Sequence, residues 1–116
     1  MGDKIDMELY GYAVNPQYIK SPTSVDESKV LTFEEFAFWH NNNKLCNYFS
    51  ALWFKRGGGF SQFSCCYLPL TKQDIYDLIE ELPLNKGEMS TLDRKFCMDA
   101  LEYIKTGKSV IISTWG

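Results

Sequence analysis

The segment from Thr32 to Lys55, TFEEFAFWHNNNKLCNYFSALWFK, decides how the rest of the chain is arranged. Thr32 is followed three residues later by Glu35. This is the pattern of a capping box, in which the hydroxyl and the carboxylate each bind a free backbone amide of the first helical turn. The run from Arg56 to Gly59 (RGGG) follows directly, and glycine allows the positive φ at which helices often end. The sequence therefore predicts one helix from Thr32 to about Lys55.

Five consecutive polar residues, His40 to Lys44 (HNNNK), interrupt the aromatic run inside this predicted helix. Asparagine is a poor helix former because its amide competes for nearby backbone groups, so a segment that only filled a core would not be expected to carry three of them. Helical spacing would place one stripe of side chains against a sheet and a second stripe, half apolar and half amide, beside it. The first stripe is Phe38, Asn42, Leu45, Phe49 and Leu52. The second stripe is Trp39, Asn43, Cys46 and Ser50, flanked by His40 and Asn47.

The second stripe is the candidate binding site. In one interpretation Trp39 stacks on a planar ligand group while Asn43 and Asn47 exchange hydrogen bonds with it, because an unpaired buried amide costs about 1–3 kcal/mol. In the simpler interpretation Trp39 belongs to the core and the asparagines are solvated or bond the backbone. In a third, the stripe contacts a protein partner. The candidate ligand-binding residues are Trp39, His40, Asn43, Asn47, Arg56 and Trp115.

The rest of the chain predicts an α+β fold. Strands are expected over 7–14, 63–68 and 109–115. Apolar residues at helical spacing predict two further helices, one over 72–81 capped by Thr71 and one from about 91 to the turn at Gly107. Residues 15–30 are a predicted loop, and a loop of that length in a small domain often covers a site. The order β-α-β-α-α-β indicates a single domain, residues 1–116, built as a two-layer sandwich of about three strands and three helices.

Composition excludes several classes of protein. The net charge of −3 and the sequence pI of about 5.1 argue against binding duplex nucleic acid through its phosphates. Four Cys and one His, with no C-x-x-C pair, do not fit a tetrahedral zinc site. The N-terminal residues lack the apolar stretch of a signal peptide, and no segment approaches the roughly 20 apolar residues of a membrane span. We therefore expect a cytoplasmic protein with reduced cysteines, without a membrane partner.

The sequence predicts no catalytic group, metal or cofactor. His40 and Cys46 would lie about 240° apart around one helix, too far to form a nucleophile–base pair. The run from Gly57 to Gly59 lacks the Lys-Ser/Thr of a phosphate-binding P-loop, although Arg56 beside it would attract an anion. A small hydrolase that uses His40 with a carboxylate is the least favoured alternative. The Ser113-Thr114-Trp115 end either completes a pocket or covers the edge of the core.

Three segments carry a resemblance to a known group of proteins. They are Asp6 to Tyr10 (DMELY), Phe38 to Phe49 (FWHNNNKLCNYF) and Val110 to Trp115 (VIISTW). These segments resemble the recurring sequence motifs DMYLY, YWRKANAIHNWF and YYSSWW of a family of small, uncharacterised phage and bacterial proteins. Trp39 and Asn43 match that pattern. His40, Asn41 and Cys46 stand where the family has Arg, Lys and His, which removes two cations and an imidazole.

The resemblance implies a phage context. It suggests a non-enzymatic binding protein that sequesters a nucleotide-derived immune signal in the host cytoplasm and so counters host defence. The alternative is a protein–protein inhibitor or adaptor that acts on a host protein. The expected partner is thus a small nucleotide-like ligand or a host protein, and a homodimer with its pocket between protomers is favoured over a monomer.

Overall fold

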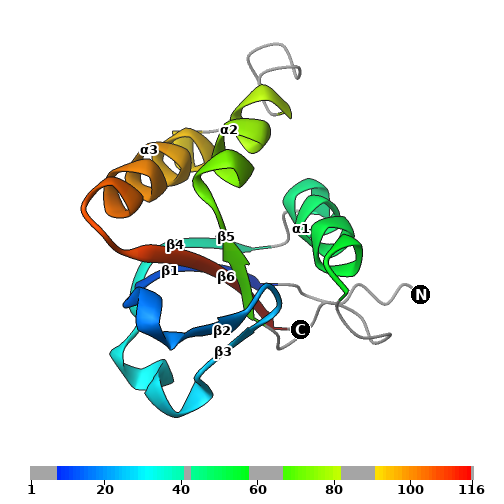
Figure 1. Ribbon diagram of the computed structural model, residues 1–116. Helices are drawn as coiled ribbons and strands as arrows, with labels where there is room; N and C mark the ends of the chain where they lie inside the picture. Colours follow the sequence, from blue (N-terminus) through cyan, green and yellow to red (C-terminus); the bar gives the residue numbers. More distant parts are fainter. Residues whose placement is uncertain (1–7, 41–42, 58–66, 82–90, 116) are drawn as a thin grey trace.

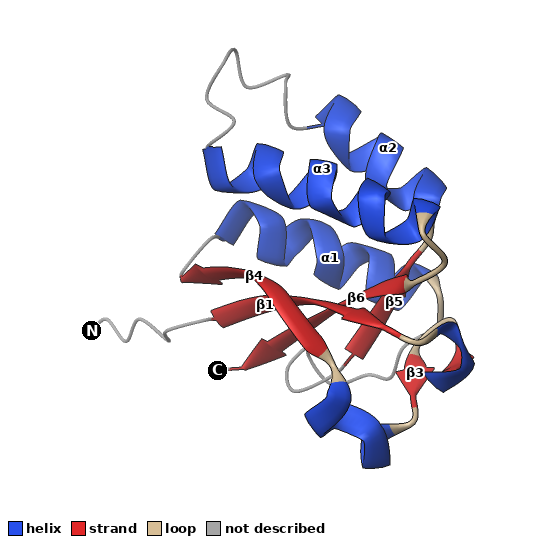
Figure 2. Cartoon of the chain, turned by 90° about the vertical axis from the view of Figure 1, so that its left-hand side faces the viewer, coloured by secondary structure: helices blue, strands red, loops and turns tan. Residues whose placement is uncertain are grey.

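The computed structural model describes residues 8–40, 43–57, 67–81 and 91–115. These residues form an α+β fold in which three helices cover one face of a four-stranded antiparallel sheet and a two-stranded hairpin lies on the other side (Figure 1; Figure 2). The strands of the sheet, in spatial order, are β4 (Glu34–His40), β1 (Glu8–Val14), β6 (Ser109–Trp115) and β5 (Tyr67–Leu70). The helices are α1 (Asn43–Lys55), α2 (Lys72–Glu81) and α3 (Thr91–Lys105). The hairpin is β2 (Ile19–Ser21) and β3 (Ser24–Val25), with the short 3-10 helices η1 (Pro16–Tyr18) before it and η2 (Glu27–Thr32) after it.

The central strand β1 shows why the helices lie on only one face. Leu9 and Ala13 are buried on the helical face, whereas Tyr10 and Tyr12 point to the opposite face and are half-buried, which is the alternation of a strand with one face in the core. Gly11 also lies on the helical face. A Cβ atom at Gly11 would come within 3.0 Å of Phe96 Cε1, so the absence of a side chain there allows α3 to approach the sheet.

Strand β4 corrects the largest error of the sequence prediction. The predicted helix start at Thr32 is wrong, because residues 34–40 pair antiparallel with β1 and α1 begins only at Asn43. The Thr32 hydroxyl donates to the Lys29 carbonyl at 2.6 Å instead of capping a helix. Along the strand Ala37 and Trp39 are buried on the helical face, while Phe38 packs on the opposite face against Tyr10, with ring centroids 5.2 Å apart. Because aromatic residues lie on both faces of β4, its sequence does not show the alternation of apolar and polar residues that is typical of a strand.

Helix α1 keeps part of its predicted face. Leu45 and Phe49 are fully buried as expected, Leu52 packs against the same cluster, and the helix ends at Lys55 as predicted. Gly57 follows with a φ of +91°, which is the positive value expected of a helix-ending glycine. Phe38, however, does not share this stripe, because it lies on β4, and Asn42 lies outside the described residues.

Helices α2 and α3 agree with the prediction. At the start of α2 the Asp74 amide donates to Thr71 Oγ1 at 3.1 Å, and the Thr71 amide donates to Asp74 Oδ2 at 2.7 Å. These two backbone N–H groups, which have no partner within the helix, are therefore both hydrogen-bonded. Ile75 and Leu78 are buried on the predicted stripe. Helix α3 begins at Thr91, and the chain leaves it through Gly107 at a φ of +98°.

The segment 15–30 is more ordered than predicted, and this changes the layer count. It forms η1, β2, β3 and most of η2, and it packs on the sheet face opposite the helices. Val25 and Phe33 are buried there against Val14 and Ile111. The two-layer sandwich of about three strands is therefore corrected to a four-stranded sheet with material on both faces. The predicted strand 63–68 overlaps β5 only at Tyr67 and Leu68, and its other residues lie outside the described part of the chain.

Candidate functional site

Trp39 occupies the core. It is 3% exposed, its indole Nε1 donates to Asp93 Oδ1 on α3 at 2.7 Å, and its ring packs on Phe96 in a T-shaped arrangement with the centroids 5.0 Å apart. Both the ring and the N–H group of the indole are thus in contact with the protein's own side chains. This arrangement corresponds to the simpler of the interpretations drawn from the sequence.

Of the residues predicted to lie beside Trp39, Cys46 is buried in the same core cluster, whereas His40 and Asn47 are exposed. His40 is exposed and lies on the opposite sheet face, where its Nδ1 is 4.0 Å from Glu8 Oε2. Asn47 is exposed on α1, and Asn43 is the first residue of that helix, its side chain lying outside what is described. In the sheet register Glu8 pairs with His40 on one side and with Trp115 on the other, so the backbone brings these two candidates to the same end of the sheet.

Arg56, one of the predicted site residues, lines a pocket. It follows the last residue of α1, and its guanidinium group reaches β5 and α2 at once. Nη1 donates to the Pro69 carbonyl at 2.9 Å, and Nη2 forms an ion pair with Asp74 Oδ1. A planar guanidinium group held at two points is fixed in orientation, which makes it a defined wall for anything that packs on it.

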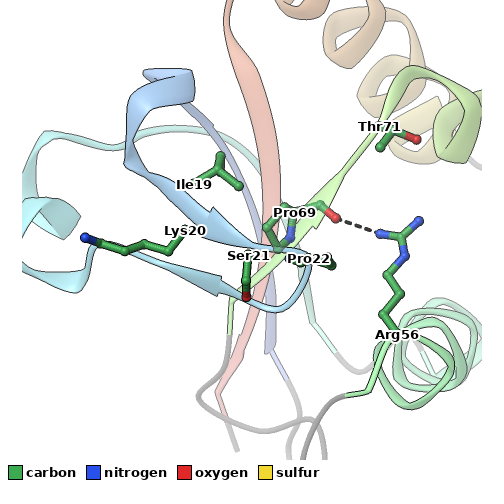
Figure 3. Close-up of a pocket in the computed structure, with 7 residues that line it drawn as sticks. All are labelled: Ile19, Lys20, Ser21, Pro22, Arg56, Pro69 and Thr71. Carbon is green, nitrogen blue, oxygen red and sulfur yellow. Dashed lines mark hydrogen bonds between the residues drawn. The ribbon is translucent and has the colours of Figure 1, made fainter.

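The pocket has a volume of about 580 Å³ and lies between the β2–β3 hairpin and the end of α1 (Figure 3). We call it the Arg56 pocket. Its lining residues are Ile19, Lys20, Ser21, Pro22, Arg56, Pro69 and Thr71. Ile19 and the two proline rings supply its apolar surface. In Figure 3 the Arg56 and Thr71 polar groups lie on one side, whereas the Lys20 side chain extends away from Arg56.

The hairpin residues of this pocket were not among the candidates drawn from the sequence. The signal that pointed to them was the length of the predicted loop over 15–30, since such a loop often covers a site. Which residue of the loop faces a pocket depends on the hairpin: Ile19 pairs with Val25, and the Ser21 hydroxyl lies 2.7 Å from the Ser24 hydroxyl. That pairing is not visible in the local sequence pattern, because the strands are only three and two residues long.

The two cysteines that the structure describes, Cys46 and Cys97, are both buried. Burial raises the pKa of the Cys97 thiol to about 11, with the Asp93 charge adding to the effect, and burial also raises the pKa of the Cys46 thiol. Both thiols therefore stay protonated and weakly nucleophilic at neutral pH. In the part of the chain that the structure describes, no cluster of three His, Cys, Asp or Glu side chains is positioned to hold a metal ion.

Comparisons with known proteins give this chain no relative. Neither the models of protein families, nor the curated proteins, nor the solved structures contain a match to it. Of the helices formed by the described residues, none has the length and apolar character needed to cross a membrane.

Proposed function

We propose that the protein is a non-enzymatic binding protein that holds a small nucleotide-like ligand in the Arg56 pocket. The observation that carries the proposal is the pocket itself. Its volume of about 580 Å³ lies within the range of roughly 300–1,000 Å³ that is usual for small-molecule sites, and mainly apolar walls with a few fixed polar groups are their usual lining.

The polar groups of the pocket suggest how such a ligand would lie. The apolar proline rings and the fixed guanidinium group suit a planar base, because arginine stacks well on aromatic rings. The ion pair with Asp74 offsets the charge of Arg56, so a phosphate group gains little there. Lys20 also lines the pocket; its side chain extends away from Arg56 in Figure 3, and a rotation of this long exposed side chain would bring its ammonium group to a phosphate. The proposed pose places the base against Arg56 and the phosphate toward Lys20.

The same proposal agrees with what the resemblance to the phage family implies. Sequestration requires affinity and no chemistry, and the protonated buried thiols are consistent with that. Capture of a nucleotide-derived immune signal would be one use of such a pocket. The proposal moves the binding site from the Trp39 stripe to the Arg56 pocket, and it retains only Arg56 from the candidate residues.

Titration calorimetry tests the proposal with mononucleotides, cyclic dinucleotides and cyclic ADP-ribose isomers as ligands. Pro22→Trp places a large ring at the exposed mouth of the pocket and should abolish binding. Lys20→Ala should weaken a phosphate-bearing ligand about fivefold, as expected for an exposed ion pair worth about 1 kcal/mol. Lys108→Ala, at an exposed lysine outside the pocket lining, is the matched control and should bind like the unmodified protein. Absence of heat with every ligand, together with no small molecule released on denaturation, would contradict the proposal.

A second function, inhibition of a protein partner, is favoured by a separate observation. A groove of about 530 Å³ runs between α2 and α3, and Tyr76 and Met98 are exposed in it, Met98 at 62%. Exposed apolar side chains of this kind are typical of protein contacts. A partner captured by the unmodified protein and by Pro22→Trp, but lost from Met98→Lys, would support this function over ligand capture.

A further inference from the structure

The two edges of the sheet differ in how well they are protected against pairing with another strand. The β5 edge is only four residues long and contains Pro69, which has no N–H to offer. The Pro69 carbonyl is already bonded to Arg56 at 2.9 Å. Short length, proline and an occupied carbonyl are devices that keep an edge strand from associating.

Within the described residues, the second half of the β4 edge lacks equivalent protection. The strand is seven residues long, and its outer side is the other end of the sheet order. Its first half carries Glu34 and Glu35 and a register shift opposite Gly11 and Tyr12, which are also protective features. From Ala37 to His40 the strand continues regularly. Among the described residues, the only element that pairs with β4 is β1 (Figure 2).

Side-chain exposure along this edge suggests what would cover it. Phe38 is 39% exposed although its ring already contacts Tyr10. Part of its apolar ring is therefore accessible beside the outer backbone groups of β4. Ala37 and Trp39, on either side of Phe38, both face the helices and are buried. An incoming strand therefore meets one aromatic side chain on one face of the sheet and a closed core on the other.

We infer that the β4 edge pairs with the β4 edge of a second copy of this chain, antiparallel and about a two-fold axis at Phe38. This register places Phe38 opposite its own counterpart and Ala37 opposite the partner's Trp39. Directly opposite residues share a sheet face, so the two Phe38 rings meet on one face while Ala37 and Trp39 stay on the helical face. Such a dimer joins two four-stranded sheets into one of eight strands.

Charge also favours a second copy in this orientation. Each β4 begins with the two carboxylates of Glu34 and Glu35 and ends with the imidazole of His40. An antiparallel pair keeps the two pairs of carboxylates at opposite ends of the interface, whereas a parallel pair would set the carboxylates of both strands side by side. The interface is isologous, as expected for a two-fold dimer.

This inference does not rest on the proposed ligand. The Arg56 pocket involves β5, at the opposite edge of the sheet, so its failure to bind a nucleotide would leave the dimer unaffected. The reverse also holds, because a monomer would still possess the pocket.

Sedimentation analysis over a range of concentrations tests the pairing. The unmodified chain, of 13.4 kDa, should reach about twice that mass, and Phe38→Lys should remain a monomer because two ammonium groups would face each other across the axis. Phe54→Lys is the matched control, since Phe54 is 47% exposed on α1, away from β4, and it should still dimerise. Unchanged far-UV circular dichroism would show that Phe38→Lys is folded.

Disulfide trapping provides a second, independent readout that does not depend on weakening the edge. In a background with Cys65 and Cys66 replaced by Ser, Phe38→Cys should give a covalent dimer on mild oxidation, whereas Phe54→Cys should not. A monomer at every concentration would overturn the inference. So would a dimer that survives Phe38→Lys or that is broken instead by Met98→Lys in the α2–α3 groove.

Discussion

Trp39 joins two segments that are 54 residues apart in the chain through one buried hydrogen bond to Asp93. Trp39→Phe removes the indole donor and leaves a smaller ring in a packed core. We expect the free energy of unfolding to fall by about 2–4 kcal/mol, the sum of a lost charge-assisted hydrogen bond and a partly filled cavity. Urea unfolding followed by circular dichroism measures this loss. Ligand affinity of the folded variant should stay unchanged, because Trp39 does not line the Arg56 pocket. The opposite result, normal stability with lost affinity, would return the binding site to Trp39.

Cys97 makes stability depend on pH in the alkaline range. Its thiol pKa is raised from 9.0 to about 11 by burial and by the Asp93 charge. The folded chain therefore holds this proton more tightly than the unfolded chain, so the stabilising contribution is complete below pH 9 and is lost as the pH rises toward 11. We expect the free energy of unfolding to decline between pH 9 and pH 10.5 and the decline to be shallower in Cys97→Ala. Urea titrations at fixed pH values compare the two slopes, which are unaffected by the cavity that alanine leaves. Equal slopes would exclude Cys97 as a source of the alkaline decline.

Helices α1 and α2 are connected through the ion pair between Arg56 and Asp74. Asp74 also accepts from the Thr71 amide and so completes the cap of α2. Arg56→Gln leaves this largely buried carboxylate without its charge partner, and we expect a loss of about 1–3 kcal/mol in the free energy of unfolding. Introducing Asp74→Asn as well should cost less than the sum of the two single changes, because the uncompensated charge is then absent. A double-mutant cycle in urea measures that coupling. Strict additivity would show that the two side chains act independently.

An element could be predicted from the sequence when its stabilising contacts are local in the chain. Helix α2 was predictable because Thr71, Asp74 and the Ile75–Leu78 stripe are all local to it. Strand β4 was not, because it is stabilised by pairing with β1 and by aromatic contacts on both faces, while the local pattern from Thr32 to Glu35 favours a helix. The same limit applies to the site. Arg56 was recognisable as a cation beside a turn, but the hairpin that completes its pocket depends on contacts distant in sequence.

In the molecule as a whole, the two edges of the four-stranded sheet carry different features. At the β5 edge, the Arg56 pocket is lined by residues of the β2–β3 hairpin, of β5 and of the turn before α2. At the opposite edge β4 pairs, among the described residues, with β1 alone, and Phe38 is partly exposed, which is where we propose that a second copy binds. Because the four strands lie between them, the two features can operate independently. A homodimer built through β4 would carry its pockets at its two outer edges, and this differs from the shared pocket between protomers that the sequence suggested.

This geometry leads to a prediction about ligand stoichiometry. Calorimetry should give one ligand per chain for the unmodified protein and for Phe38→Lys, with equal dissociation constants, because the β4 edge and the Arg56 pocket share no residue. A pocket formed between protomers would instead bind one ligand per two chains and would lose its affinity when Phe38→Lys separates them. Phe54→Lys serves as the control for the added charge. Reduced affinity in Phe38→Lys alone would mean that the second copy contributes to the ligand site. It would contradict the prediction that the β4 edge and the Arg56 pocket act independently.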